Sequence, residues 1–79
     1  MRKGDLVRIQ ASDLYAGNRT KNIVRENGLD FVFHDIKFTK IDETLVEAIL
    51  VESASTDWMG WLPIAELKHV EKSKMKEKQ

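Results

Sequence analysis

Alternating apolar and polar residues predict that the chain begins with a β-strand. Over residues 5–10, Val7 and Ile9 fall on one face, the polar residues fall mostly on the other, and Gly4 precedes them as a breaker. Period-two alternation is typical of a strand with one buried face. Residues 11–22 are rich in Ser, Asp, Gly, Asn and Thr, so we expect a long loop there.

The dipeptide Asn27-Gly28 is the strongest turn signal in the sequence. Asn and Gly tolerate the positive φ angles that a type I′ hairpin turn requires. The dipeptide therefore predicts a hairpin that joins residues 23–26 to the next strand. A short helix over residues 20–26, with Gly28 as its cap, is the alternative.

Residues 29–41 contain all three phenylalanines of the chain. Phe31 and Phe33 stand at odd-numbered positions, whereas Ile36 and Phe38 stand at even-numbered positions. A regular strand cannot place all four on one face, because side chains alternate with period two. A bulge near residues 34–35, or two shorter strands, would restore the register.

Residues 44–52 carry apolar side chains at both parities, as in a strand that is buried on both faces. A helix capped by Asp42 would give a similar pattern. The β-branched side chains of Val46, Ile49 and Val51, together with a turn at residues 42–43, favour the strand.

The last third of the chain predicts two further strands. Residues 53–57 form a turn, and residues 58–62 form a short strand that ends at Pro63. Proline can open one helical turn, which we expect over residues 64–66 before a final strand at 67–70. The alternative is a longer helix that runs from Pro63 into the end of the chain.

These elements describe a mainly β fold, and two segments resemble those of SH3-like barrels, a group that includes the KOW domains. Residues 60–67 (GWLPIAEL) are similar to the SH3 segment in which glycine, an aromatic residue, an aliphatic residue and proline precede a helical turn. Residues 3–9 (KGDLVRI) are similar to the first strand of KOW-type barrels. The resemblance implies a small barrel of five to six short antiparallel strands with one helical turn before the last strand. We expect residues 1–70 to form this single domain.

The same resemblance bears on function. Tyr15 matches the tyrosine of the first SH3 loop, and Pro63 matches the proline of the peptide groove. The tyrosine of the final turn, however, is replaced by Glu66, and no tryptophan follows Thr44. A flat aromatic shelf is what binds proline-rich peptides, so these departures argue against that ligand.

Composition narrows the classes of protein to which the chain can belong. The 79 residues include 13 Lys+Arg, 13 Asp+Glu and no cysteine. Disulfides and thiolate zinc sites are excluded, and the absence of cysteine fits a reducing cytoplasm. A neutral chain is not typical of strong non-specific DNA binding, and no apolar run is long enough to span a membrane. Residues 71–79 hold four lysines and two glutamates, so we expect a flexible lysine-rich tail.

Catalytic and metal-binding patterns are weak. The two histidines, His34 and His69, lack the spacing of a metal-binding pair, and no glycine-rich phosphate loop is present. We expect no enzymatic activity, no metal and no cofactor.

Two groups of residues remain as candidates for binding a partner. The aromatic group is Tyr15, Trp58 and Trp61, with Pro63 beside it, and the basic group is Arg19, Lys21 and Arg25. Trp58 and Trp61 have opposite parities, so one indole must leave the core face. Exposed aromatic residues and loop cations are typical of interaction surfaces. The sequence thus predicts a protein-interaction module, an accessory or regulatory protein that docks on a larger complex and binds a partner with an acidic surface. A barrel that binds RNA or single-stranded nucleic acid is the alternative.

Overall fold

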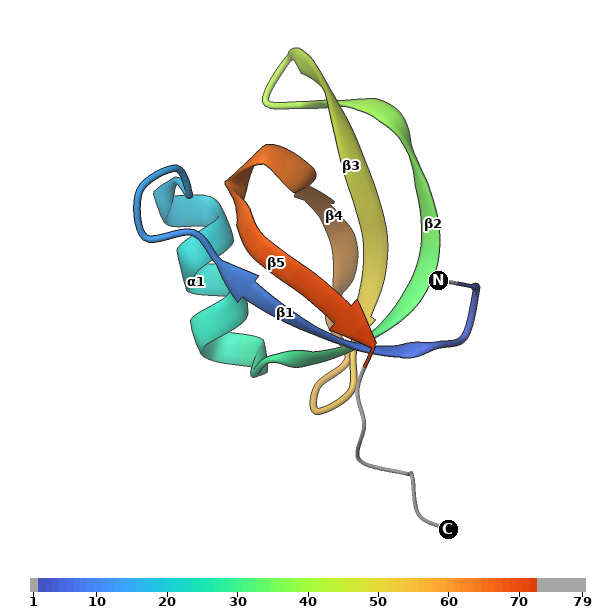
Figure 1. Cartoon of the computed structure of the whole chain (residues 1–79). Helices are drawn as coiled ribbons and strands as arrows, with labels where there is room; N and C mark the ends of the chain where they lie inside the picture. Colours follow the sequence, from blue (N-terminus) through green and yellow to red (C-terminus); the bar gives the residue numbers. More distant parts are fainter. Residues whose placement is uncertain (1, 73–79) are drawn as a thin grey trace, which may run out of the picture.

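The computed structural model describes residues 2–72, which form one five-stranded antiparallel sheet and one α-helix (Figure 1). In chain order the elements are β1 (Leu6–Ala11), α1 (Asn18–Asn27), β2 (Asp30–Ile41), β3 (Thr44–Ser53), β4 (Met59–Pro63), the 3-10 helix η1 (Ile64–Glu66) and β5 (Leu67–Lys72). The strand order is β4-β3-β2-β1-β5, so β4 and β5 form the two edges and the sheet is not closed. The expected mainly β fold, with five antiparallel strands and a helical turn before the last one, is confirmed.

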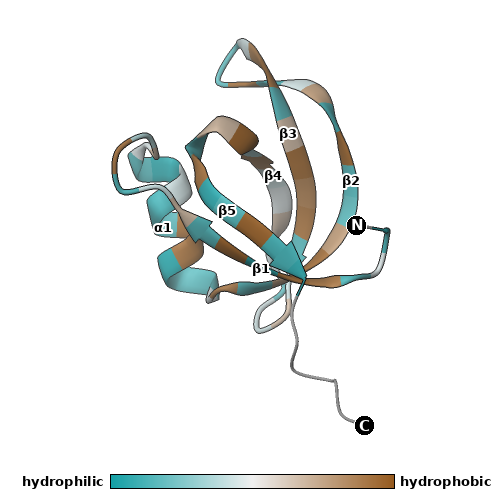
Figure 2. Ribbon diagram, in the orientation of Figure 1, coloured by the Kyte–Doolittle hydropathy of each residue, from teal (hydrophilic) through white to brown (hydrophobic). Residues whose placement is uncertain are grey.

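The core lies on the inner side of the curved sheet. It consists of Val7, Ile9, Phe31, Phe33, Ile49, Val51 and Leu62. One apolar residue of α1, Ile23, packs against this cluster, as do residues of η1 and β5. Figure 2 shows hydrophobic residues along β3 and through the turn from β4 to β5. Because Val7 and Ile9 are fully buried while Arg8 between them is exposed, the alternation expected of the first strand is confirmed.

The hairpin of β2 and β3 is the longest element pair, and it contains the expected bulge. Phe33 pairs with Val51 and Ile36 pairs with Ile49, so the register shifts between Phe33 and Asp35. The extra residue places Ile36 on the same face as Phe33, because directly paired residues point to the same side of a sheet. The helical alternative for residues 44–52 is wrong, since this segment is a strand throughout.

The hairpin expected at Asn27-Gly28 is wrong, and the loop expected over residues 11–22 is confirmed only for residues 12–17. Residues 18–27 form α1, as in the alternative interpretation of the sequence. Gly28 does adopt a positive φ of 83°, but there it ends the helix, and its N–H donates to the carbonyl oxygen of Val24 at 3.0 Å. The side-chain amide of Asn27 donates to the carbonyl oxygen of Ile23, so both residues satisfy helical carbonyls instead of turning a hairpin.

A type I′-like turn does occur, but at residues 42–43. Asp42 has a φ of 53° and Glu43 a φ of 68°. The turn expected between the second and third strands is therefore confirmed, with both central residues in the left-handed region.

The end of the described chain follows the expected order. The 3-10 helix covers residues 64–66 and a strand follows, so the long helix from Pro63 is wrong. β5 continues to Lys72, two residues beyond the expected end of the domain at residue 70. The remainder of the predicted lysine-rich tail, residues 73–79, lies outside the described residues.

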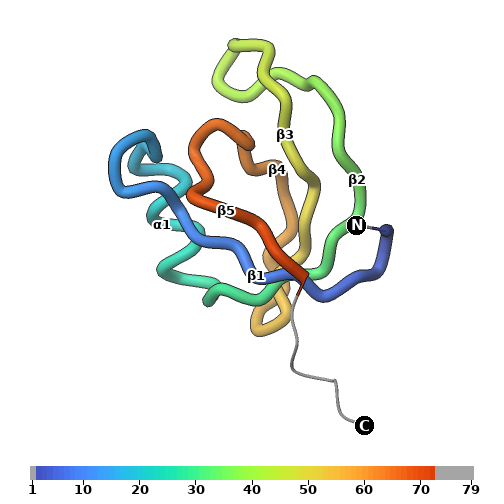
Figure 3. Tube along the Cα trace, in the orientation of Figure 1, coloured from blue at the N-terminus to red at the C-terminus, as the bar shows by residue number. Residues whose placement is uncertain are grey.

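Glu66 joins α1 to η1. Its Oε1 atom accepts hydrogen bonds from the Gly17 N–H at 3.1 Å and from the Thr20 hydroxyl at 2.6 Å. Thr20 is fully buried, so this carboxylate satisfies a hydroxyl that has no access to water. The contact fixes the start of α1 against the segment between β4 and β5. Figure 3 traces the path of the backbone through both segments.

Candidate functional site

Tyr15 lies in the segment between β1 and α1 and is 73% exposed. A local turn holds this segment, because the Ser12 hydroxyl oxygen accepts hydrogen bonds from the N–H groups of Leu14 and Tyr15. Leu14 beside it is also exposed. The tyrosine is therefore accessible, but no ring–ring contact within residues 2–72 joins it to Trp58 or Trp61.

The three predicted cations are on α1 rather than on a loop, and the helix separates them. Lys21 and Arg25 are one turn apart and lie on the same side, whereas Arg19 is rotated away from both. The Arg19 guanidinium donates to the carbonyl oxygen of Trp61 in β4 at 2.9 Å. Arg19 therefore links the helix to the sheet, and only the other two cations share a surface.

Lys21 and Arg25 line a groove of about 330 Å³ between α1, β1 and β5, which we call the cationic groove. The remaining lining residues are Gln10, Ala11, Asp13, Val24, Leu29 and Lys68. The third cation, Lys68, was not among the residues that the sequence pointed to. In the pairing of β1 with β5, Gln10 lies opposite His69 and Ala11 lies opposite Leu67, so Lys68 is the extra residue at the register shift. Strand pairing therefore places Lys68 beside Gln10 and Ala11, which also line the groove.

Trp58 belongs to the core side of the molecule. Its ring meets that of Phe31 edge-on, with centroids 6.3 Å apart, and it packs against the core cluster. The indole also covers Gly60, where an added Cβ would come 2.7 Å from Cζ2 of Trp58. Of the two tryptophans, Trp58 is thus the one that faces the core, and it is not a freely exposed anchor.

Trp61 lies on the opposite face of β4 and is half-buried. The ammonium group of Lys37 lies 5.5 Å from its ring centroid, a cation–π contact that covers one face of the indole. Pro63 is buried and pairs with Ala48. It borders a pocket of about 250 Å³ between the end of the β2–β3 hairpin and η1, lined by Ile41, Asp42, Thr44, Val46, Pro63 and Glu66.

A third surface was missed by sequence reasoning. Beyond the core, residues 35–47 of the β2–β3 hairpin project as an arm (Figure 1). Ile36, Phe38 and Leu45 on this arm are 48%, 65% and 63% exposed. Phe38 pairs with Glu47 and Lys40 pairs with Leu45, so the three apolar side chains lie on one face in neighbouring rows. We call them the arm patch.

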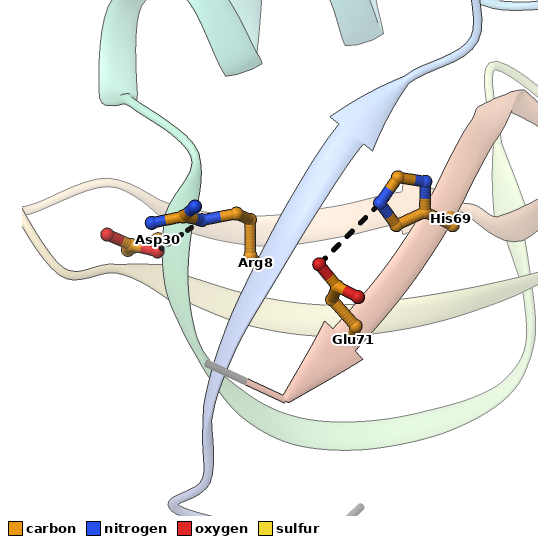
Figure 4. A network of polar contacts seen from close by, with 4 residues as sticks. All are labelled: Arg8, Asp30, His69 and Glu71. Atoms are coloured by element: carbon orange, nitrogen blue, oxygen red, sulfur yellow. Dashed lines mark hydrogen bonds and ion pairs between the residues drawn. The ribbon is translucent and has the colours of Figure 1, made fainter. Parts of the chain in front are cut away.

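The outer face of β1 and β5 is polar, in contrast to the arm patch. Figure 4 shows Arg8 beside Asp30, with 3.3 Å between Nε and Oδ1, and His69 beside Glu71, with 3.8 Å between Nε2 and Oε2. Arg8 is also the cross-strand partner of Glu71. Exposed pairs of this kind contribute about 0–1 kcal/mol each to stability, so this face is a solvated surface with balanced charges.

The histidines and carboxylates of the described residues are the candidates for metal ligands and proton-transfer groups. Within residues 2–72 no group of three or more His, Cys, Asp and Glu residues is arranged to hold a metal ion. His34 sits in the bulge with its Nε2 atom 3.2 Å from Oε1 of Glu52. No α-helix among the described residues has the length and hydrophobicity needed to cross a bilayer. The sequence matches no family model, and neither a curated protein nor a solved structure matches the chain.

Proposed function

We propose that the protein is a non-enzymatic interaction module that docks on a larger protein through the arm patch. The observation that carries the proposal is the exposure of Ile36, Phe38 and Leu45 on one face of a projecting hairpin. Large apolar side chains that gather on a surface are typical of protein interfaces, and a central aromatic residue often contributes most of the binding energy. Phe38 is the residue of the arm best suited to this role.

The backbone of the arm supports the same function. β4 pairs with β3 only from Ala48 to Glu52, and β1 pairs with β2 only at residues 30–32. Within residues 2–72, both outer edges of the arm are therefore without a neighbouring strand. Free strand edges with apolar side chains beside them can accept a partner segment by strand addition.

We further propose that the scaffold is an SH3-like barrel in a cytoplasmic protein. The antiparallel order of the strands and the one-turn helix before β5 support the first part, and the absence of cysteine supports the second. Scaffolds of this kind support many functions, so the docking proposal depends on the arm patch and not on the fold.

The test is affinity capture of the tagged full chain from the cytosol of its source cells, with and without nuclease and at two salt concentrations. The wild type is compared with Phe38→Ser/Leu45→Ser and with a matched control, Leu14→Ser/Tyr15→Ser, which removes two exposed apolar residues elsewhere. We expect the wild type to capture one protein, and this capture should persist after nuclease treatment and at the higher salt concentration. The control variant should capture the same protein, whereas the arm variant should not. Binding of the purified partner to the arm variant should weaken by about tenfold or more.

Other outcomes contradict the proposal. Equal capture by the wild type and the arm variant would exclude the arm patch as the docking surface. Loss of all bound material after nuclease would favour the RNA-binding alternative, in which Phe38 stacks on a base and Lys40, on the same face, contacts a phosphate, because such binding weakens steeply with salt.

A further inference from the structure

The cationic groove is a second surface with its own chemistry. Its three cations come from two elements that are far apart in the sequence: Lys21 and Arg25 from α1 and Lys68 from β5. The fold thus gathers positive charge here although the whole chain has equal numbers of basic and acidic residues. Of the residues that the structure describes, Asp13 is the one carboxylate in the lining.

Among the described residues, no carboxylate forms an ion pair with any of the three cations. The ion pairs within residues 2–72 are Arg8–Asp30, His34–Glu52 and His69–Glu71, and none of them includes a groove cation. Arg25 donates to the side-chain oxygen of Asn22, which leaves other N–H groups of its guanidinium available. The groove therefore presents donors to an anionic ligand without first having to break a salt bridge.

The floor of the groove is aliphatic. Ala11, Val24 and Leu29 line it, and Leu29 keeps 40% of its surface exposed. The described part of the chain contributes no aromatic ring to the lining. A ligand that matches both parts would place carboxylates against the cations and an aliphatic side chain against Leu29.

We propose that the cationic groove binds a short acidic peptide segment in which an aliphatic residue lies between carboxylate residues. The carboxylates contact Lys21, Arg25 and Lys68, and the aliphatic side chain packs on Val24 and Leu29. This site goes beyond the docking function of the arm patch, because it shares no residue with that patch and binds by charge complementarity.

A peptide fits the groove better than a nucleic acid does. Single-stranded nucleic acids need aromatic rings for stacking and a continuous positive track along several nucleotides. Here the lining is aliphatic, and the neighbouring outer face of the sheet carries Asp30 of β2 and Glu71 of β5 beside its cations. Residues 73–79 contain three lysines and one glutamate, so the rest of this chain does not complement the groove either.

The experiment is a titration of the ¹⁵N-labelled full chain with the capped peptide Glu-Asp-Leu-Glu-Asp, followed by NMR and by calorimetry. We expect amide shifts at Lys21, Leu29 and Lys68. The variant Lys21→Glu/Lys68→Glu should lose about tenfold or more in affinity. The matched control Lys3→Glu/Lys40→Glu makes the same charge change at exposed positions outside the groove and should bind within about twofold of the wild type.

Two further probes define the specificity. The uncharged peptide Gln-Asn-Leu-Gln-Asn should not bind, and Glu-Asp-Ser-Glu-Asp should bind more weakly than the parent peptide because it lacks the aliphatic contact. Absence of binding at millimolar peptide would overturn the proposal, as would an equal loss of affinity in the two charge-reversal variants. Tighter binding of oligouridine to the same amides would assign the groove to RNA instead. None of these results depends on Phe38, so failure here leaves the arm-patch test unaffected.

Discussion

At the scale of single residues, Gly60 shows how the absence of a side chain at one position can determine where a neighbouring side chain lies. The Trp58 indole occupies the space above Gly60 and meets Phe31 edge-on at 6.3 Å. Sequence parity predicted that one tryptophan would leave the core face, but it could not tell which. The missing side chain of Gly60 settles the choice, because only a glycine leaves room for the ring of Trp58 on the core side.

Gly60→Ala should therefore destabilise the fold, because its Cβ would lie 2.7 Å from the indole and the ring must move. We expect the free energy of unfolding to fall by about 1–3 kcal/mol, as in other overpacked cores. Chemical denaturation followed by tryptophan fluorescence measures this change. The effect should be much smaller in a Trp58→Leu background, and equal costs in the two backgrounds would show that the indole is not responsible.

At the scale of elements, α1 depends on a contact from outside the helix. Gly17 precedes the helix and offers no side-chain cap, and the first turn has no acidic residue. The carboxylate of Glu66 supplies the acceptor instead, although it is 46 residues from Thr20 in the sequence. This explains why helical signals within residues 11–28 were too weak to outweigh the Asn27-Gly28 turn signal.

Glu66→Ala should destabilise the protein by about 1–3 kcal/mol, because it leaves the buried Thr20 hydroxyl without its acceptor. A double-mutant cycle with Thr20→Val, measured by urea denaturation, checks the cause. In the Glu66→Ala background the valine should cost little or should stabilise the fold. Strictly additive effects of the two substitutions would contradict the coupling.

The turn of the β2–β3 hairpin contains strain that substitution can remove. Asp42 and Glu43 both have positive φ, a region that is unfavourable by about 1–2 kcal/mol for residues other than glycine. We expect Glu43→Gly to raise the free energy of unfolding by about 0.5–1 kcal/mol. The matched control Glu47→Gly, in the strand of the same hairpin, should lower it by about the same amount. A decrease at both positions would show that Glu43 is not strained in solution.

At the scale of the whole molecule, β2 and β3 are longer than the part of each strand that packs in the core. The bulge near residue 34 was predictable from the change of parity between Phe33 and Ile36, and it does return both to one face. The four apolar residues of this segment were expected to share one face and they do, yet the core ends near Ile49 and the hairpin continues beyond it, so Ile36 and Phe38 are exposed. The exposure of Phe38 depends on which other elements reach it, and no pattern within residues 29–41 contains that information.

The two halves of β2 should therefore respond differently to truncation. Phe33→Ala removes a buried ring and should cost about 3–5 kcal/mol, whereas Phe38→Ala should change stability by no more than about 0.5 kcal/mol. Thermal unfolding of both variants gives the comparison. A large loss of stability for Phe38→Ala would place this residue in the core and remove the structural basis of the arm patch.

The central claim, that the exposed arm patch contacts another protein, is tested most directly by photo-crosslinking from the arm in intact cells. Benzoylphenylalanine replaces Phe38 in one variant and Tyr15, which is also exposed, in another. The account predicts one discrete protein adduct from position 38, with a much weaker adduct or none from position 15. Equal adducts from both positions, or crosslinks from position 38 to RNA alone, would contradict it.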